Sequence, residues 1–221
     1  LLYIGTSELI TWPALQFFIP GLLSGSSGGA DIITRFNHFD VNWYRDLATG
    51  GYNTEPFTNA DHPVIGAANW AFFPVMPMLW RALANITPWG VDTAGFILAN
   101  FASWGSAVML YFWSSKMFGS QTGLRTALIW VFSAFGVYGF IPYTEPIFNF
   151  LFIGLVLAGL SGYWILSGIL GATLSATRSV GVFTVIPLAY LAWQTFGTRL
   201  IDFRNREAAA ARLAVFLVPL G

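Results

Sequence analysis

The sequence predicts an all-α membrane protein: a polytopic helical bundle with about six to seven transmembrane helices and a long first extracytoplasmic loop that carries interfacial helices. Three observations predict this fold class. Hydrophobic residues make up 56% of the chain and charged residues only 9%, whereas soluble domains carry about 25% charged residues. Apolar segments with the length of a membrane-crossing helix recur along the chain. A polar, aromatic-rich stretch over residues 24–92 separates the first of these segments from the others.

The apolar segments follow one another through short connections after this stretch. By residue number they run over 1–23, 93–113, 124–141, 147–160, 164–177 and 180–196, and a seventh begins after an arginine-rich loop. The chain starts and stops within apolar sequence. We therefore interpret residues 1–221 as a single transmembrane domain at the N-terminal end of a longer protein, with residues 24–92 as an extracytoplasmic loop within it.

This long loop contains two predicted interfacial pieces. The first is an amphipathic helix in the interface plane, because apolar residues recur there at helical spacing: Trp43, Tyr44, Leu47 and Ala48. The pair Gly50-Gly51 predicts its end. The second piece covers residues 70–80, and we expect it to be broken at Pro74 and Pro77, since proline lacks the N–H that a helix interior uses.

The distribution of basic residues orients the segments. With the long loop outside, the turn that holds Lys116 and Arg125 falls in the cytoplasm, as the positive-inside rule requires. The loop after residue 196 falls there too, and it carries four arginines: Arg199, Arg204, Arg206 and Arg212. The connections around Glu145 and Arg178 are then placed on the outer side.

Composition also limits the possible functions. The formal net charge is zero, which argues against a nucleic-acid partner, because phosphate backbones bind to basic surfaces. There is no cysteine and there are only two histidines, so we expect neither a thiolate nucleophile nor a histidine-rich metal site. No cofactor is predicted.

Asp40 is the first candidate for chemistry, because it places a carboxylate in a polar loop at the predicted membrane surface. It could act as a general base that removes a proton from an acceptor hydroxyl. It could equally be the cap of the interfacial helix. Periodicity alone favours the cap, and one residue could fill both roles.

Two further ionisable residues lie next to apolar segments. Glu145 is expected in a tight turn before residue 147, where a charged group close to hydrocarbon suggests a function as readily as a solvated turn. Arg178 lies between two short apolar segments on the predicted outer side, where its guanidinium fork suits a phosphate. Snorkelling to the interface is the alternative for Arg178, and we favour phosphate binding.

The pair Asp61-His62 could assist acid–base work or contribute to a metal site. Two ligands do not make a metal site, so an ordinary loop role is favoured for both residues. They are kept as candidate substrate-binding residues together with two tyrosines, Tyr52 and Tyr143.

The order of these motifs resembles the GT-C superfamily of integral membrane glycosyltransferases, and most closely the PIG-V-like mannosyltransferase group with its bacterial relatives. The likeness extends from about Asp40 to Gly181. The residues that carry it are Asp40, Gly51-Tyr52, Ala71-Phe72-Phe73-Pro74-x-x-Pro77, Tyr143-Thr144-Glu145 and Thr177-Arg178-x-x-Gly181. Two departures are Phe39, where the group has tryptophan, and a longer insertion over residues 58–69.

The resemblance implies transfer of a sugar, expected to be mannose, from a polyprenyl-phosphate donor to a hydroxyl of a lipid or glycan acceptor. Transfer would proceed with inversion on the extracytoplasmic face, in a bacterial plasma membrane. By position, Asp40 looks like the catalytic base and residues 24–92 like the catalytic loop. One arginine, Arg178, would then suffice to stabilise the departing lipid phosphate, so a metal is not required.

Two other functions compete with this one. A transporter or lipid flippase would use Glu145 and Arg178 as intramembrane substrate groups, and it predicts ionisable residues along a midplane cavity. A non-catalytic scaffold predicts no convergence of ionisable residues. The enzyme predicts that Asp40, Glu145 and Arg178 share one outer pocket that opens to lipid.

Overall fold

The computed structural model describes residues 40–56, 68–133, 136–139 and 141–221. The first predicted segment, residues 1–23, and the pair Asp61-His62 lie outside the described residues. The all-helical fold class is confirmed for the described part of the chain, which has eight α-helices and no strand. It divides into two compact units, one of residues up to 100 with 132–143, and one of residues 101–131 with 144–221.

In the first unit, helix α3 (Asp40–Thr49) packs against helix α4 (Val75–Ile86). The amphipathic helix predicted here is confirmed, and its buried residues are Val41, Tyr44, Leu47 and Ala48. This apolar face is thus covered by protein, whereas the sequence suggested a face turned to the membrane interface. The short 3-10 helix η1 (Asn69–Ala71) and the first part of α5 (Val91–Phe118) complete the unit's helices before residue 100.

The second predicted interfacial piece breaks at only one of its two prolines. Pro74 is the N-cap of α4, but Pro77 is the third residue of that helix and is buried within it. The expectation of a break at Pro77 is wrong because the first-turn N–H groups of a helix have no acceptor inside it. A proline there therefore removes no hydrogen bond.

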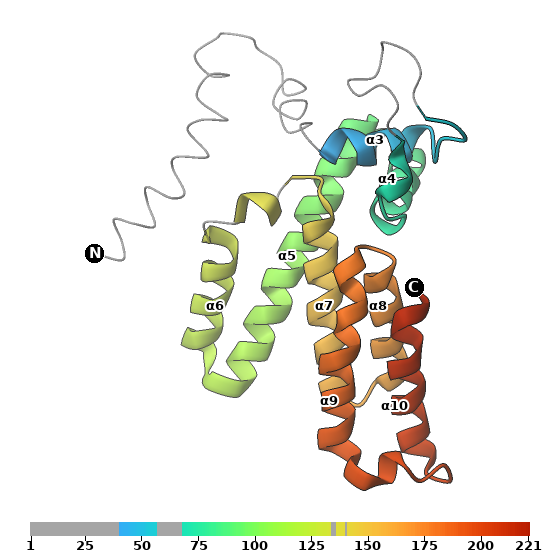
Figure 1. The fold of residues 1–221 in the computed structure, drawn as a ribbon. Helices are drawn as coiled ribbons and strands as arrows, with labels where there is room; N and C mark the ends of the chain where they lie inside the picture. The colour runs from blue at the N-terminus through green and yellow to red at the C-terminus, as the bar shows by residue number, and fades with distance from the viewer. Residues whose placement is uncertain (1–39, 57–67, 134–135, 140) are drawn as a thin grey trace. The chain divides into compact units, whose positions relative to one another are not determined.

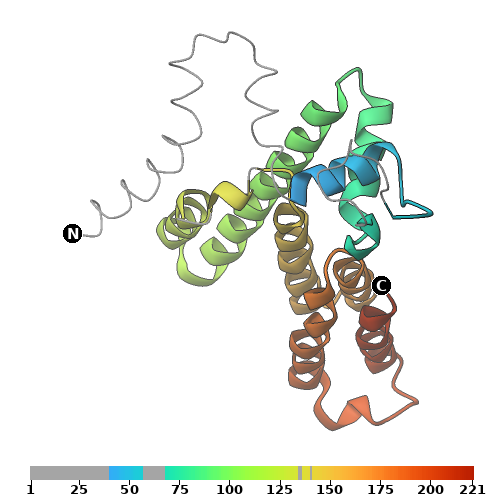
Figure 2. The ribbon, with the colours of Figure 1, turned by 45° about the horizontal axis from the view of Figure 1, so that its top comes forward.

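The second unit holds helices α7 to α10, which lie side by side in both views (Figure 1, Figure 2). Each helix contacts two of the other three: α7 lies beside α8 and α9, and α10 lies beside α8 and α9. The bounds are α7 Thr144–Leu160, α8 Trp164–Ser175, η3 Ser179–Thr184, α9 Val185–Phe196, η4 Gly197–Leu200, α10 Arg206–Leu217 and η5 Val218–Leu220. Their shared core includes Leu155, Leu174 and Leu188, all fully buried.

Two described helices are long and apolar enough to cross a membrane: α5, with 28 residues, and the continuous helical stretch Ser179–Leu200, with 22. The other apolar helices are shorter, α7 with 17 residues and α8 with 12. Helix α6 (Ser120–Phe132) ends before residue 141, where the third apolar segment was expected to end. Ser133, Gly136 and Gly139 follow, and serine and glycine are weak helix formers.

Small residues bring α8 and α10 into close contact. A Cβ added to Gly168 would lie 2.6 Å from the Cα of Ala214, and one added to Gly171 would lie 2.6 Å from Val218 Cγ2. The hydroxyl of Ser175 donates to the carbonyl oxygen of Val218 at 2.6 Å. Glycine is therefore required on this face of α8, as at other helix interfaces built from small residues.

We expect Gly168→Ala to destabilise the second unit by about 1–3 kcal/mol, because the new methyl group would meet backbone atoms that cannot move independently of α10. Gly154→Ala is the matched control. Its Cβ would meet only Leu170 Cδ1, at an ordinary 3.4 Å, so alanine there should be neutral or should stabilise α7 by up to about 1 kcal/mol. Thermal unfolding of both variants in detergent checks this, and equal melting temperatures would contradict it.

Candidate functional site

The structure brings two of the predicted site residues, Glu145 and Arg178, into direct contact. Arg178 Nη1 donates to Glu145 Oε1, and the two residues form an ion pair across 33 positions of sequence. Both belong to the second unit. The pair joins the beginning of α7 to the connection between α8 and η3, so it marks one end of the four-helix arrangement.

Glu145 occupies the first turn of α7, not a turn between helices as the sequence suggested. Its neighbours Thr144 and Pro146 are buried, and Pro146 is tolerated because it, too, lies in the first turn, where no intrahelical acceptor is lost. The expectation of a tight turn is therefore wrong. A carboxylate in this position is stabilised by the partial positive charge at the N-terminus of the helix.

The position of Arg178 is fixed by the backbone around it. Its N–H donates to the carbonyl of Leu174 at 3.2 Å, and its own carbonyl accepts from the N–H of Gly181 at 2.8 Å. Arg178 itself is extended, with φ −156° and ψ 151°. A Cβ on Gly181 would lie 2.1 Å from the Leu174 carbonyl oxygen. Only glycine fits there, and it lets η3 start directly against the end of α8.

The ion pair is half-open to its surroundings. The Arg178 side chain is 39% exposed and that of Glu145 is 36% exposed. A surface pair of this kind contributes only about 0–1 kcal/mol to folding. Among the described residues, the Arg178 guanidinium makes no second side-chain hydrogen bond. Its remaining N–H groups are therefore available to an oxyanion, while Glu145 fixes the orientation of the guanidinium plane.

Charged side chains in α7, α8 and α9 are confined to the helix ends. Residues 146–177 and 179–198 contain no Asp, Glu, Lys, Arg or His. The helical middle sections of α7, α8 and α9 thus carry no ionisable acid or base beyond tyrosine. Arg178 is thus the only cation among residues 146–198.

Asp40 is the first residue of α3 and is exposed. It lies in the first unit. Two arginines that were not among the predicted site residues hold α3 in place. Arg81 donates from Nε to the Ala48 carbonyl at 2.6 Å and from Nη2 to the Leu47 carbonyl at 3.0 Å. Both carbonyls lie in the last turn of α3, and that of Leu47 also accepts from the Gly51 N–H at 3.0 Å.

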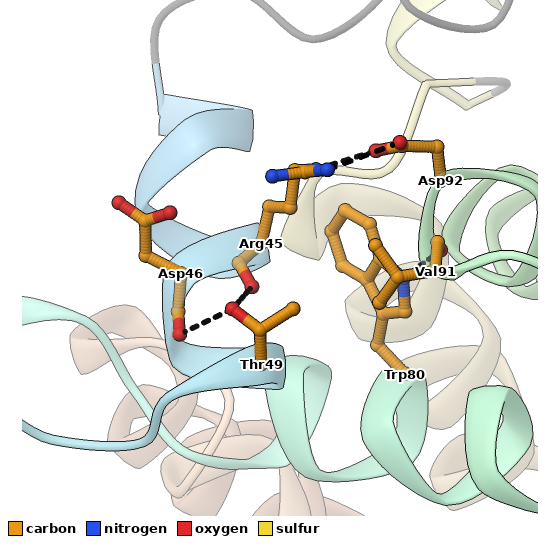
Figure 3. A network of polar contacts seen from close by, with 6 residues as sticks. All are labelled: Arg45, Asp46, Thr49, Trp80, Val91 and Asp92. Carbon is orange, nitrogen blue, oxygen red and sulfur yellow. Dashed lines mark hydrogen bonds and ion pairs between the residues drawn. The ribbon is translucent and has the colours of Figure 1, made fainter.

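A second arginine ties α3 to the start of α5. Arg45 Nε donates to Asp92 Oδ1 at 2.6 Å and Nη2 donates to Oδ2 at 3.2 Å, the two-pronged geometry visible in Figure 3. The hydrogen bond to Asp92 raises the pKa of Arg45 above its ordinary value, partly offset by burial. Figure 3 also shows the indole of Trp80, whose Nε1 donates to the Val91 carbonyl at 2.5 Å. The platform that carries Asp40 is thus fixed at several points.

Tyr52, a predicted substrate-binding residue, has a partner in the backbone. Its hydroxyl donates to the Phe72 carbonyl at 2.6 Å, and its side chain remains 48% exposed. Burial of part of the ring raises the pKa of the Tyr52 phenol. The ring of Phe72 stacks on Trp43 with centroids 5.4 Å apart. Tyr52 therefore closes the loop after α3 onto the Phe72-Phe73-Pro74 segment.

Asn69 is a residue of this loop that sequence reasoning missed. It is 1% exposed. Its Nδ2 donates to the Gly51 carbonyl at 3.0 Å and its Oδ1 accepts from the Asn53 N–H at 3.0 Å. A lone asparagine gives no local signal of this role, because both partners lie more than a dozen positions earlier in the chain.

The last predicted binding residue, Tyr143, stacks on Tyr138, with ring centroids 6.0 Å apart. Of the seven predicted site residues, the structure therefore joins Glu145 and Arg178, and places Asp40, Tyr52 and Tyr143 in the first unit. Asp61 and His62 lie outside the described residues.

Neither a metal site nor a known relative points to a further functional site in the described part of the chain. Within the described ranges, no group of three or more His, Cys, Asp or Glu side chains could hold a metal ion. No family model, curated protein or solved structure matches this chain.

Proposed function

We propose that this protein is an integral membrane glycosyltransferase of GT-C-like architecture, with about six to seven transmembrane helices. It moves a sugar, mannose in the first instance, from a polyprenyl-phosphate donor to a hydroxyl of a lipid or glycan acceptor. The reaction takes place on the extracytoplasmic face of a bacterial plasma membrane. The observation that carries the proposal is the half-open Arg178–Glu145 pair at the end of a group of uncharged helices.

In the proposed reaction, the acceptor oxygen attacks the anomeric carbon of the donor sugar from the face opposite the phosphate. The bond between the anomeric carbon and the phosphate oxygen breaks, and its electron pair leaves with the lipid monophosphate. Asp40 takes the proton of the acceptor hydroxyl, for which it must come within about 2.6–3.2 Å of that oxygen. Arg178 stabilises the charge that grows on the leaving phosphate.

Glu145 has a positioning role in this scheme. One nitrogen of Arg178 is engaged by Glu145, so the remaining N–H groups point in a fixed direction. A guanidinium that is already oriented loses less conformational entropy when it binds the phosphate. The nearby carboxylate also prevents the arginine from holding the released lipid phosphate too tightly, because the site carries no net charge before the donor arrives.

The transporter or flippase is the alternative function. It calls for ionisable groups along a path through the middle of the membrane. The stretches 146–177 and 179–198 offer none, and the one ion pair of this region lies at a helix end. This distribution favours chemistry at the membrane surface over passage of a charged substrate through these helices.

A donor screen tests the proposal. The protein in native-like membranes is offered radiolabelled polyprenyl-phosphate sugars and, separately, nucleotide sugars, with acceptor lipids extracted from the host membrane. We expect labelled product with a polyprenyl-phosphate sugar and none with a nucleotide sugar. Product from nucleotide sugars without a lipid intermediate would refute the donor class, and movement of intact donor between leaflets without transfer would favour the flippase.

We expect sugar transfer to survive removal of divalent cations. The charge that develops on a lipid monophosphate is stabilised by hydrogen bonds from Arg178, so no bridging metal is needed, in contrast to a nucleoside diphosphate leaving group. Initial rates before and after treatment with excess chelator should agree within about twofold. A strict requirement for added Mg²⁺ or Mn²⁺ would contradict this mechanism.

A further inference from the structure

The connection between α9 and α10 exposes two large apolar side chains at the end of the second unit opposite the Arg178–Glu145 pair. Ile201 is 69% exposed and Phe203 is 84% exposed, the largest exposed fraction among the described hydrophobic residues. This connection, residues 197–206, lies at the bottom of Figure 1, between the labelled helices α9 and α10. Exposed apolar side chains rimmed by polar residues are typical of surfaces that contact a protein or a membrane.

Basic residues surround these two side chains. Arg199, Arg204 and Arg206 are exposed, and none of them forms an ion pair with a carboxylate of the described residues. Residues 197–206 hold three arginines and one acid, which gives this connection a net charge of +2. The surface therefore combines projecting apolar groups with unneutralised positive charge.

The connection is held in this exposed form by its own contacts. Arg212 Nη1 donates to the carbonyls of Leu200 at 3.0 Å and Asp202 at 3.1 Å, and its guanidinium lies 5.0 Å from the Phe203 ring centroid. Asn205 caps α10 by accepting from the N–H groups of Glu207 and Ala208, each at 3.1 Å. The fold thus projects Ile201 and Phe203 outward, although burying them would be favourable if no partner covered them.

We propose that residues 197–206 form a membrane-surface contact that selects anionic phospholipids. Ile201 and Phe203 insert at the boundary between headgroups and acyl chains, while Arg199, Arg204 and Arg206 bind lipid phosphates. The connection overlaps the last residues of the 22-residue apolar stretch Ser179–Leu200. In the proposed membrane placement, that end of the stretch lies where the bilayer meets water. Positive charge beside inserted apolar groups matches an anionic lipid surface. The inference rests on the membrane placement of the proposed function and is independent of sugar transfer.

The chain has no cysteine, so a single reporter can be introduced without removing others. Ile201→Cys carrying a small apolar fluorophore is reconstituted into vesicles of phosphatidylcholine with trace nitroxide-labelled phosphatidylcholine or nitroxide-labelled phosphatidylglycerol. We expect the reporter to be quenched more strongly by the labelled phosphatidylglycerol, which measures its enrichment at this position. Each arginine should contribute roughly fivefold to that enrichment at low salt, and about 1 M salt should abolish it.

Three variants carrying the same reporter test the cause. The first variant changes three arginines to glutamine, Arg199, Arg204 and Arg206, and should lose the enrichment. The second changes the same residues to lysine and should keep the enrichment, because lysine retains the positive charge near the surface. Arg125→Gln removes one exposed arginine outside the connection and should leave it unchanged.

Equal quenching by the two labelled lipids in the parent reporter would overturn the proposal. Quenching that requires a high protein-to-lipid ratio would overturn it too, since the partner would then be a second copy of the chain. If aqueous iodide quenches the reporter in both kinds of vesicle, residues 197–206 face water or a soluble protein. This result would also overturn the proposal. A failed donor screen would leave the lipid measurement standing, and the reverse also holds.

Discussion

Asp40→Asn should lower the rate constant of sugar transfer by about 10²–10⁴-fold, the range expected when a general base is removed. The carboxylate would no longer accept the proton of the acceptor hydroxyl. Asparagine has nearly the same size as aspartate, and Asp40 is exposed at the first residue of α3, so the helix should be retained. The substitution therefore separates the two roles that the sequence left open, base and cap. Initial rates with the donor found in the screen measure the effect.

Asp46→Asn is the matched control, because it makes the same chemical change on the same helix. It should retain most of the activity. Far-UV circular dichroism and thermal unfolding should be equal for the parent and the Asp40→Asn variant. A folded Asp40→Asn protein with normal transfer would exclude the base assignment, and loss of the fold would assign Asp40 a structural role instead.

Arg178→Ala is expected to reduce kcat/KM for the lipid-phosphate donor by about 10²–10³-fold, as the loss of one charge-stabilising donor does in other active sites. The dependence on acceptor concentration should change much less. Folding should be little affected, because the exposed ion pair contributes only about 0–1 kcal/mol. Steady-state rates over a matrix of donor and acceptor concentrations separate these effects.

Two companion variants define what Arg178 does. Glu145→Gln keeps the size of its partner and removes the charge, so it should raise the KM for the donor less than Arg178→Ala raises it. Arg125→Ala deletes an exposed arginine elsewhere in the chain and should leave donor use intact. If Arg178→Ala left the donor dependence unchanged, the phosphate-binding role would be disproved.

Much of the helical content could be predicted because it depends on local properties of the sequence. Apolar runs predicted α5, α7, α8 and α9, and apolar residues at helical spacing predicted α3. Helix starts were harder to predict. Pro77 and Pro146 both lie in the first turn of a helix, where proline does not interrupt hydrogen bonding. From the sequence alone, a proline next to apolar residues is interpreted as a break in the helix.

The sequence singled out Glu145 and Arg178 and predicted that they converge, whereas it gave no sign of the contacts that hold α3 in place. Glu145 and Arg178 drew attention because charge beside apolar sequence is costly, and the structure joins them. Arg45 and Asp92 lie 47 positions apart within polar sequence, where neither residue is unusual. The same holds for Arg81, whose partners are backbone carbonyls. The shared pocket of Asp40 with the Arg178–Glu145 pair stays a prediction.

The uncharged stretch between Arg178 and Arg199 has the length that the proposed membrane placement requires. It holds about 20 residues, which at a rise of about 1.5 Å per residue span about 30 Å, close to the thickness of a bilayer's hydrocarbon layer. A guanidinium at each end resists transfer into hydrocarbon, so a thinner bilayer is matched by tilt of the helix and a thicker one by local thinning of the bilayer or snorkelling of the arginines. Under the proposed function, acyl-chain length would thereby influence the depth at which Arg178 meets the donor phosphate.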